Sequence, residues 1–187
     1  MAVRRSGRRA VPAGGWTWLG PMRAGALALL LAATGGDAAA QTGSELDFFI
    51  GEWDLTSVDS AGNVVGRSRT SARWILDGTT IQDDFYGLDP TGAVIFRGTS
   101  LRTFVPSTRQ WVVHWAMANQ PGYTYIDARW IDGELVGDGR GFDAGGDFVE
   151  RYRYYGITPT SYSFELARSY DGGTSWTAYP EIRALKR

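Results

Sequence analysis

Two side chains in this sequence have the chemistry for proton transfer, His114 and Glu150. His114 is the only histidine of the chain, and it lies in the apolar stretch 111–118. An imidazole can act as a general acid or base near neutral pH. No serine or cysteine nucleophile and no orienting carboxylate stands beside His114 in the sequence, although catalysis of that kind needs such partners. We therefore favour a histidine in the wall of a strand, with catalysis as the alternative.

Glu150 alternates with three aromatic residues: Phe148, Tyr152 and Tyr154. If residues 147–156 form a strand, this alternation places all four side chains on one face. A carboxylate on a buried, apolar face must be paired or protonated. We expect Arg102 or Arg168 to pair with Glu150. The pair is then either a salt bridge near the end of the fold, which we favour, or a group that orients a ligand.

The sequence offers little material for a metal or cofactor site. It contains no cysteine and one histidine, so thiolate zinc sites, thiol catalysis and disulfide bonds are excluded. No spacing of its carboxylates resembles a calcium-binding loop. We expect neither a metal nor a cofactor, and the packed core alone must hold the fold.

The charge of the chain argues against nucleic acid as a partner. Five of the 19 basic residues and one of the 20 acidic residues lie in the first forty positions, which leaves 14 basic against 19 acidic residues and a net charge of −5. The arginines of this remainder are dispersed and form no basic stripe, which a nucleic-acid-binding surface would need.

We expect an export leader over residues 1–40 and a single domain over residues 41–187. Met22-Arg23 precedes an apolar run that ends near residue 33, and Ala38-Ala39-Ala40 follows, as in a secretory signal peptide. The run is too short to span a membrane. Cleavage near Ala40 would therefore leave a periplasmic or secreted protein without a membrane anchor. Met22 is a candidate start of translation, with a mis-assigned extension before it.

The rest of the chain consists of strands separated by turns. Runs rich in β-branched and aromatic residues alternate with turn sequences such as Asp77-Gly78 and Asp132-Gly133. These runs predict strands over residues 52–58, 64–76, 79–87, 93–105, 110–118, 123–131, 134–141, 147–156, 161–170 and 175–185. A flat meander of this size would leave two open edges. We therefore predict an all-β fold, a single antiparallel up-and-down barrel of about 8–10 strands, with a two-sheet sandwich as the alternative.

The stretch 46–55 predicts a short helical turn that closes one end of the barrel. Leu46, Phe49 and Ile50 fall on one helical face, and Ser44 is a candidate cap. Gly51 then permits a sharp turn into the first strand. A ligand site is therefore expected at the opposite end.

The motif Phe48-x-x-Gly51-x-Trp53 resembles the Gly-x-Trp signature that opens lipocalin-type (calycin) barrels. The whole of residues 41–187 is also similar to a group of exported bacterial proteins of unknown function that are assigned a lipocalin-like fold. The resemblance implies structural roles for Gly51 and Trp53, with Trp53 packed across the closed end. It further implies that an arginine near the last strand, here Arg183, lies on the ring of Trp53. It implies a fold and no particular function.

A second resemblance concerns residues 169–176, Ser-Tyr-Asp-Gly-Gly-Thr-Ser-Trp, which are similar to the Asp-box hairpin of sialidases. In that hairpin the aspartate binds backbone amides and the tryptophan packs beneath the turn. The resemblance implies structural roles for Asp171 and Trp176. One copy in so short a chain does not indicate a sialidase propeller.

Three functions fit these expectations, and we favour a non-enzymatic exported barrel that holds a small apolar or aromatic ligand. The side chains expected to contact this ligand are Trp74, Asp83, Arg102, Trp115, Glu150, Tyr152, Tyr154 and Phe164. The first alternative is an isomerase, cyclase or hydratase on the same barrel, with His114 or Glu150 as the proton-transfer group. The second alternative is a filled barrel whose outer surface binds a protein or glycan.

Overall fold

A computed structural model describes residues 42–118 and 122–187, so the leader expected over residues 1–40 lies outside the described residues. The described part is all-β, with two short 3-10 helices, η1 (Asp47–Phe49) and η2 (Leu76–Gly78). The strands are β1 (Gly51–Val58), β2 (Val64–Ile75), β3 (Thr80–Leu88), β4 (Val94–Val105), β5 (Gln110–Met117), β6 (Tyr123–Ile131), β7 (Glu134–Asp143), β8 (Gly146–Tyr155), β9 (Ser161–Ser169), β10 (Thr177–Ala178) and β11 (Glu181–Lys186).

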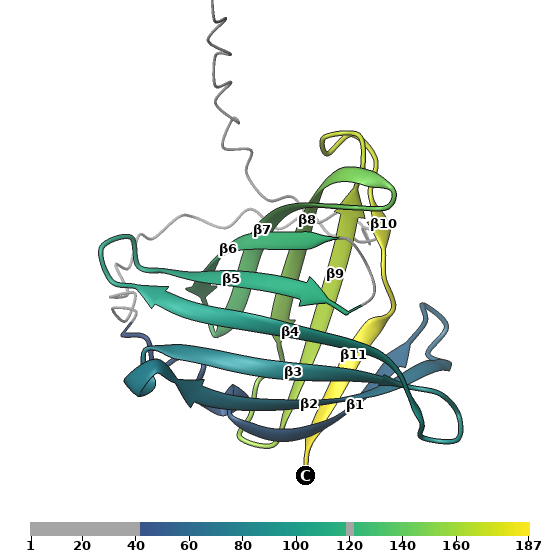
Figure 1. Cartoon of the computed structure of the whole chain (residues 1–187), viewed down its shortest axis with the longest axis horizontal. Helices are drawn as coiled ribbons and strands as arrows, with labels where there is room; N and C mark the ends of the chain where they lie inside the picture. Colours follow the sequence, from purple (N-terminus) through teal and green to yellow (C-terminus); the bar gives the residue numbers. More distant parts are fainter. Residues whose placement is uncertain (1–41, 119–121) are drawn as a thin grey trace, which may run out of the picture. The chain divides into compact units, whose positions relative to one another are not determined.

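The strands close into an antiparallel barrel (Figure 1). Strands β1 to β9 pair in sequence order, and β11 then pairs with both β9 and β1, which closes the ring. In the described residues the ring therefore contains ten strands, and the predicted all-β up-and-down barrel is confirmed.

The last predicted strand, 175–185, is in fact divided into β10 and β11. Tyr179-Pro180 separates them, and both pair with β9. Proline has no N–H to donate to the neighbouring strand, so the ladder is interrupted at this position.

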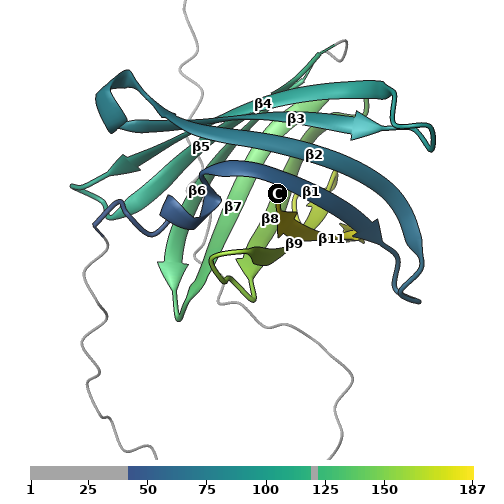
Figure 2. The same cartoon turned by 90° about the horizontal axis from the view of Figure 1, so that it is seen from below.

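One end of the barrel is filled by residues 46–50, which we call the plug (Figure 2). Its helical turn has no side-chain cap, so the expected cap by Ser44 is wrong; the carbonyl of Ser44 instead accepts the Asp47 amide at 3.0 Å. Gly51 follows the plug with φ +122°, a conformation that favours glycine.

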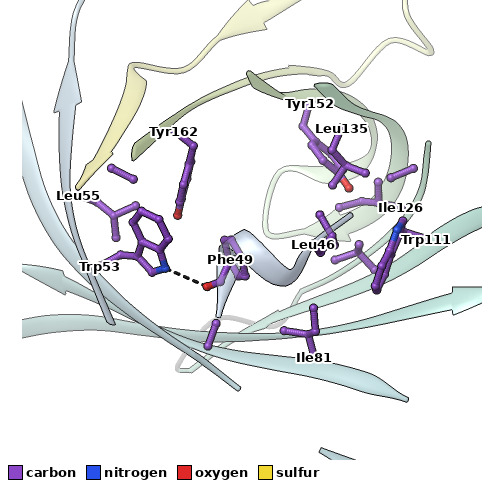
Figure 3. Close-up of a cluster of buried hydrophobic side chains, with 14 residues drawn as sticks. Leu46, Phe49, Trp53, Leu55, Ile81, Trp111, Ile126, Leu135, Tyr152 and Tyr162 are labelled. Atoms are coloured by element: carbon purple, nitrogen blue, oxygen red, sulfur yellow. Dashed lines mark hydrogen bonds between the residues drawn. The ribbon is translucent and has the colours of Figure 1, made fainter. Parts of the chain in front are cut away.

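The core of the barrel surrounds the plug (Figure 3). Leu46 and Phe49 are buried, and Trp53 has 0% of its surface exposed. The indole Nε1 of Trp53 donates to the Phe49 carbonyl at 2.9 Å, and the ring of Tyr162 lies 4.8 Å from that of Trp53. The side chain of Trp53 therefore links the first strand to the plug inside the barrel.

Two hairpins at the opposite end, which we call the open end, have the same construction. In the β1–β2 and β3–β4 turns, the Oδ1 atom of Asp59 or Asp89 accepts the amides two and four residues later at 2.8–2.9 Å. A β-bulge follows each turn, and its unpaired residue, Val65 or Ile95, is exposed.

Candidate functional site

The strand register places the eight predicted ligand-binding side chains on the inner face of the barrel. Residues that pair across antiparallel strands project to the same face. One inward row passes around the barrel through Trp74, Ile81, Arg102, Val113, Ile126, Gly139, Glu150 and Arg168. The other five lie in three further rows: Asp83 and Trp115 share one, Tyr152 lies in a second, and Tyr154 pairs with Phe164 in a third at the closed end.

Asp83 and Arg102 form a buried ion pair in the middle of the barrel. Ser100 contributes hydrogen bonds to both, and Thr70 Oγ1 donates to Asp83 Oδ2 at 3.3 Å. Arg102 Nη2 also donates to the hydroxyl of Tyr154 at 3.1 Å. The two opposite charges compensate each other, so this pair leaves no net charge in the interior.

Glu150 pairs with Arg168, one of the two arginines considered for it. Arg168 Nη2 and Nε lie 3.0 and 3.2 Å from Glu150 Oε2, and its Nη1 donates to Asp143 Oδ2 at 2.7 Å. Burial raises the pKa of Glu150, while the charge of Arg168 acts against that rise. The guanidinium also stacks 3.7 Å from the Phe148 ring centroid. The four side chains form one network near the open end.

His114 lies on the outer face of β5. Its Nδ1 shares a hydrogen bond with the hydroxyl of Tyr123, and its ring packs edge-on against Tyr125 at 5.2 Å. The inward residues of the same strand are its neighbours Val113 and Trp115. His114 and Glu150 are thus on opposite sides of the wall and cannot serve one site. The enzyme alternative named either residue, and of these His114 lies outside the barrel while Glu150 is paired with Arg168.

Two buried hydrogen-bond donors in the interior have no partner in the described residues, the Tyr152 hydroxyl and Trp111 Nε1. Both side chains face the core around the plug (Figure 3). Leaving such a donor unpaired costs about 1–3 kcal/mol. Desolvation raises the pKa of Tyr152, so its hydroxyl keeps its proton and remains a donor.

Three further interior residues, Phe85, Ser100 and Leu166, were not among the predicted ligand contacts. Phe85 packs edge-on against Trp115 at 5.9 Å, and both rings stay only partly buried. The alternation Ile81–Asp83–Phe85 carried the signal for Phe85. Ser100 gave no such signal, because a serine does not mark a face.

The space beside the plug is closed. A gap remains between Phe49, Arg102, Leu135 and Tyr154, and it is too small to hold a water molecule. Any ligand inside the barrel must therefore lie on the open side of the Asp83–Arg102 pair.

The expected stacking of Arg183 on Trp53 is wrong. Arg183 is exposed and pairs with Glu181 at 3.1 Å, whereas Lys186 Nζ lies 5.2 Å from the Trp53 ring centroid. The reason is the register, because Lys186 stands opposite Trp53 and Arg183 stands opposite Thr56. An offset of three residues puts the arginine on the outer face.

The turn at residues 169–176 is held by Asp171. Its carboxylate accepts the amides of Thr174 and Ser175 at 2.9–3.1 Å and the Ser175 hydroxyl at 2.6 Å. Trp176 Nε1 donates to the carbonyl of Gly173 at 3.0 Å, and Arg151 covers its ring at 4.4 Å. Both side chains are thus engaged in local contacts.

No protein-family model matches this chain, and a comparison with curated proteins found no match. The helices in residues 42–118 and 122–187 are all too short to cross a membrane. The same residues contain no group of three histidine, cysteine or acidic side chains placed to hold a metal ion.

Proposed function

We propose that this protein is an exported β-barrel that holds a small, uncharged, apolar or aromatic molecule in the open half of its interior. The observation that carries the proposal is the size of the inward residues in that half. A barrel of ten strands is wider than one of eight, and an eight-stranded barrel is only just filled by its side chains. Nine inward positions of the open half carry only glycine, serine or threonine: Ser57, Gly66, Ser68, Gly87, Gly98, Ser100, Thr124, Gly139 and Gly141. They pair with the larger inward residues Phe85, Phe96, Trp115, Met117 and Phe148.

The glycines add to this argument because they let large side chains lie along the wall. A Cβ atom at Gly98 would be 2.3 Å from the Trp115 ring, and one at Gly141 would be 2.7 Å from the Phe148 ring. Both rings therefore lie flat over the backbone of these two glycines and do not project toward the barrel axis. Such flat aromatic walls are typical of pockets for apolar ligands.

The charges of the interior favour an uncharged ligand. Asp83 is paired with Arg102, and Arg168 is shared between Glu150 and Asp143, so neither arginine is free. A charged ligand would have to lose its hydration without gaining a free counter-charge from these pairs. An apolar molecule avoids this cost.

The first experiment asks whether the barrel retains or accepts such a molecule. Native mass spectrometry of protein purified from its own host is expected to show an added small mass. The uncharged dye N-phenyl-1-naphthylamine is expected to gain fluorescence on binding, with saturation at one dye per chain. A protein with no retained mass and no dye binding would contradict the proposal.

A matched pair of variants on β2 locates the binding. Ser68 faces the interior and Ser71 faces outward, so Ser68→Leu fills the open half and Ser71→Leu leaves it unchanged. We expect Ser68→Leu to weaken dye binding at least roughly fivefold, about 1 kcal/mol, and Ser71→Leu to bind as the parent does. Equal effects of the two substitutions would place the dye elsewhere. Thermal melting of both variants verifies that the barrel is intact.

Export is the second part of the proposal and is supported by the leader pattern that ends at Ala40. Expression of the full chain in a bacterium, followed by N-terminal sequencing of the exported protein, is expected to give a chain that begins at Gln41. A protein that stays in the cytoplasm with its leader intact would contradict export and leave the ligand test unaffected.

A further inference from the structure

The outer wall of the barrel carries a depression of about 440 Å³ that the interior site does not involve. It crosses β3, β4 and β5 and is open to solvent. Its floor is low because β5 presents small side chains there, Ala116 and the following Ala118, while Tyr86 and Arg97 rise from the neighbouring strands. Its volume lies within the range of about 300–1,000 Å³ that small-molecule sites occupy.

One charged group in this depression is already compensated. Asp84 accepts hydrogen bonds from Arg73 at 3.1 Å and from Gln82 and Thr99, each at 3.2 Å. Desolvation acts to raise the pKa of Asp84, but these hydrogen bonds together outweigh it and lower the pKa. Asp84 thus stays ionised, and Arg73 balances its charge.

The other charged group is not compensated. Arg97 is exposed, and its side chain has no ion pair or hydrogen bond among the described residues; its guanidinium lies 5.7 Å from the Tyr86 ring centroid. A guanidinium offers five donors in a planar fork that matches a carboxylate. The depression therefore combines an apolar floor, one aromatic wall and one available cation.

We propose that this depression binds a small organic carboxylate. The carboxylate is held by Arg97, and the apolar body of the ligand lies on Ala116 and Ala118 beside Tyr86. The site is separate from the interior, since Gly98 and its strand lie between the depression and Trp115. The two sites also differ in the charge of the molecule that they favour.

The repeated hairpins supply a matched control. Arg67 stands eight residues after Asp59, as Arg97 stands eight residues after Asp89. Arg67 is also exposed and without an ion pair among residues that the structure describes, but it does not line the depression. Its substitution changes the net charge by the same amount as that of Arg97.

The test is an NMR titration of the isotope-labelled protein with phenylacetate and, separately, with the uncharged 2-phenylethanol. Phenylacetate is expected to shift the backbone amides of residues 97–99 and 116–118. Phenylacetate is expected to bind about tenfold more tightly than 2-phenylethanol, because the alcohol has no carboxylate to accept the charge-assisted hydrogen bonds from Arg97.

Three variants complete the test. Arg97→Gln is expected to weaken phenylacetate binding about tenfold, Ala116→Leu to prevent it by filling the floor, and Arg67→Gln to leave it unchanged. All three residues are exposed, so the fold is expected to survive. The proposal is overturned if Arg67→Gln and Arg97→Gln weaken binding equally, if 2-phenylethanol binds as tightly, or if the shifted amides belong to inward residues only.

Discussion

The guanidinium of Arg102 lies 4.3 Å from the centroid of the Phe49 ring and joins the plug to the barrel wall. The same guanidinium pairs with Asp83 on the neighbouring strand and donates to Tyr154 on the far side of the barrel. One side chain of β4 thus links the plug, β3 and β8. Cation–π contacts that are shielded from water are worth about 2 kcal/mol.

The buried pair is expected to be essential for stability. Arg102→Met removes the cation and leaves Asp83 as an unpaired buried charge, which costs about 3–5 kcal/mol of the free energy of unfolding. Urea unfolding followed by tryptophan fluorescence measures the loss. The double variant Asp83→Asn, Arg102→Met removes both charges and is expected to recover at least half of it. A double variant as unstable as the single one would instead assign the loss to packing on Phe49.

Alternation was sufficient to predict the inward faces of several strands. On β8 it placed Phe148, Glu150 and Tyr152 on one side, and the structure buries all three. On β5 both faces are apolar in sequence, so alternation could not orient His114. The structure gives the reason, since Tyr123 and Tyr125 of β6 cover the outer face of β5 beside His114. Rings on a neighbouring strand make that face semi-buried without making it part of the core.

Contacts between distant strands could not be predicted in the same way. The Gly-x-Trp resemblance implied that Arg183 lies on Trp53, but the pairing of β1 with β11 places Lys186 there instead. The partner of Glu150 was likewise open between Arg102 and Arg168 until the β8–β9 register was known. Local periodicity fixes a face, whereas register is a property of two strands and their turn.

The position of Lys186 makes a direct comparison with Arg183 informative. Lys186→Ala removes the cation from the Trp53 ring and is expected to lower the free energy of unfolding by about 0.5–1 kcal/mol. Arg183→Ala is expected to change it by less than about 0.5 kcal/mol, because its side chain is exposed. Chemical unfolding of both variants measures the difference. A larger loss of stability in Arg183→Ala than in Lys186→Ala would contradict the register of β1 and β11 at the closed end.

The Asp171 turn is expected to make stability depend on acid pH. Hydrogen bonds from the Ser175 side chain and amide, and from Ser169, lower the pKa of Asp171 well below its usual range. Because the folded-state pKa of Asp171 is depressed, its carboxylate adds to the free energy of unfolding. This contribution is complete above the unfolded-state pKa of about 3.9 and is lost as the pH falls below that value. Asp171→Asn is therefore expected to lower the melting temperature at pH 7, with a difference from the parent that shrinks toward pH 2.

Asp147→Asn serves as the control for this pH dependence, since Asp147 is an exposed acidic residue of β8 outside the turn. Its melting temperature is expected to follow that of the parent at each pH. A constant difference between Asp171→Asn and the parent from pH 7 to pH 2 would show that the Asp171 charge is not what holds the turn.

The wall glycines give the most direct test of a hollow open half. Gly98→Ala places a Cβ atom 2.3 Å from the Trp115 ring, so the ring must move off the wall and into the barrel. We expect a loss of about 1–3 kcal/mol in the free energy of unfolding, as for other overpacked sites, together with weaker binding of N-phenyl-1-naphthylamine. Gly66→Ala is the control, because its Cβ would meet only Ser57 at 3.4 Å, an ordinary contact. That variant is expected to be unchanged or up to about 1 kcal/mol more stable. If Gly98→Ala lowers stability but leaves dye binding intact, the Trp115 ring does not border the ligand, and the proposed site must lie nearer the Glu150–Arg168 network.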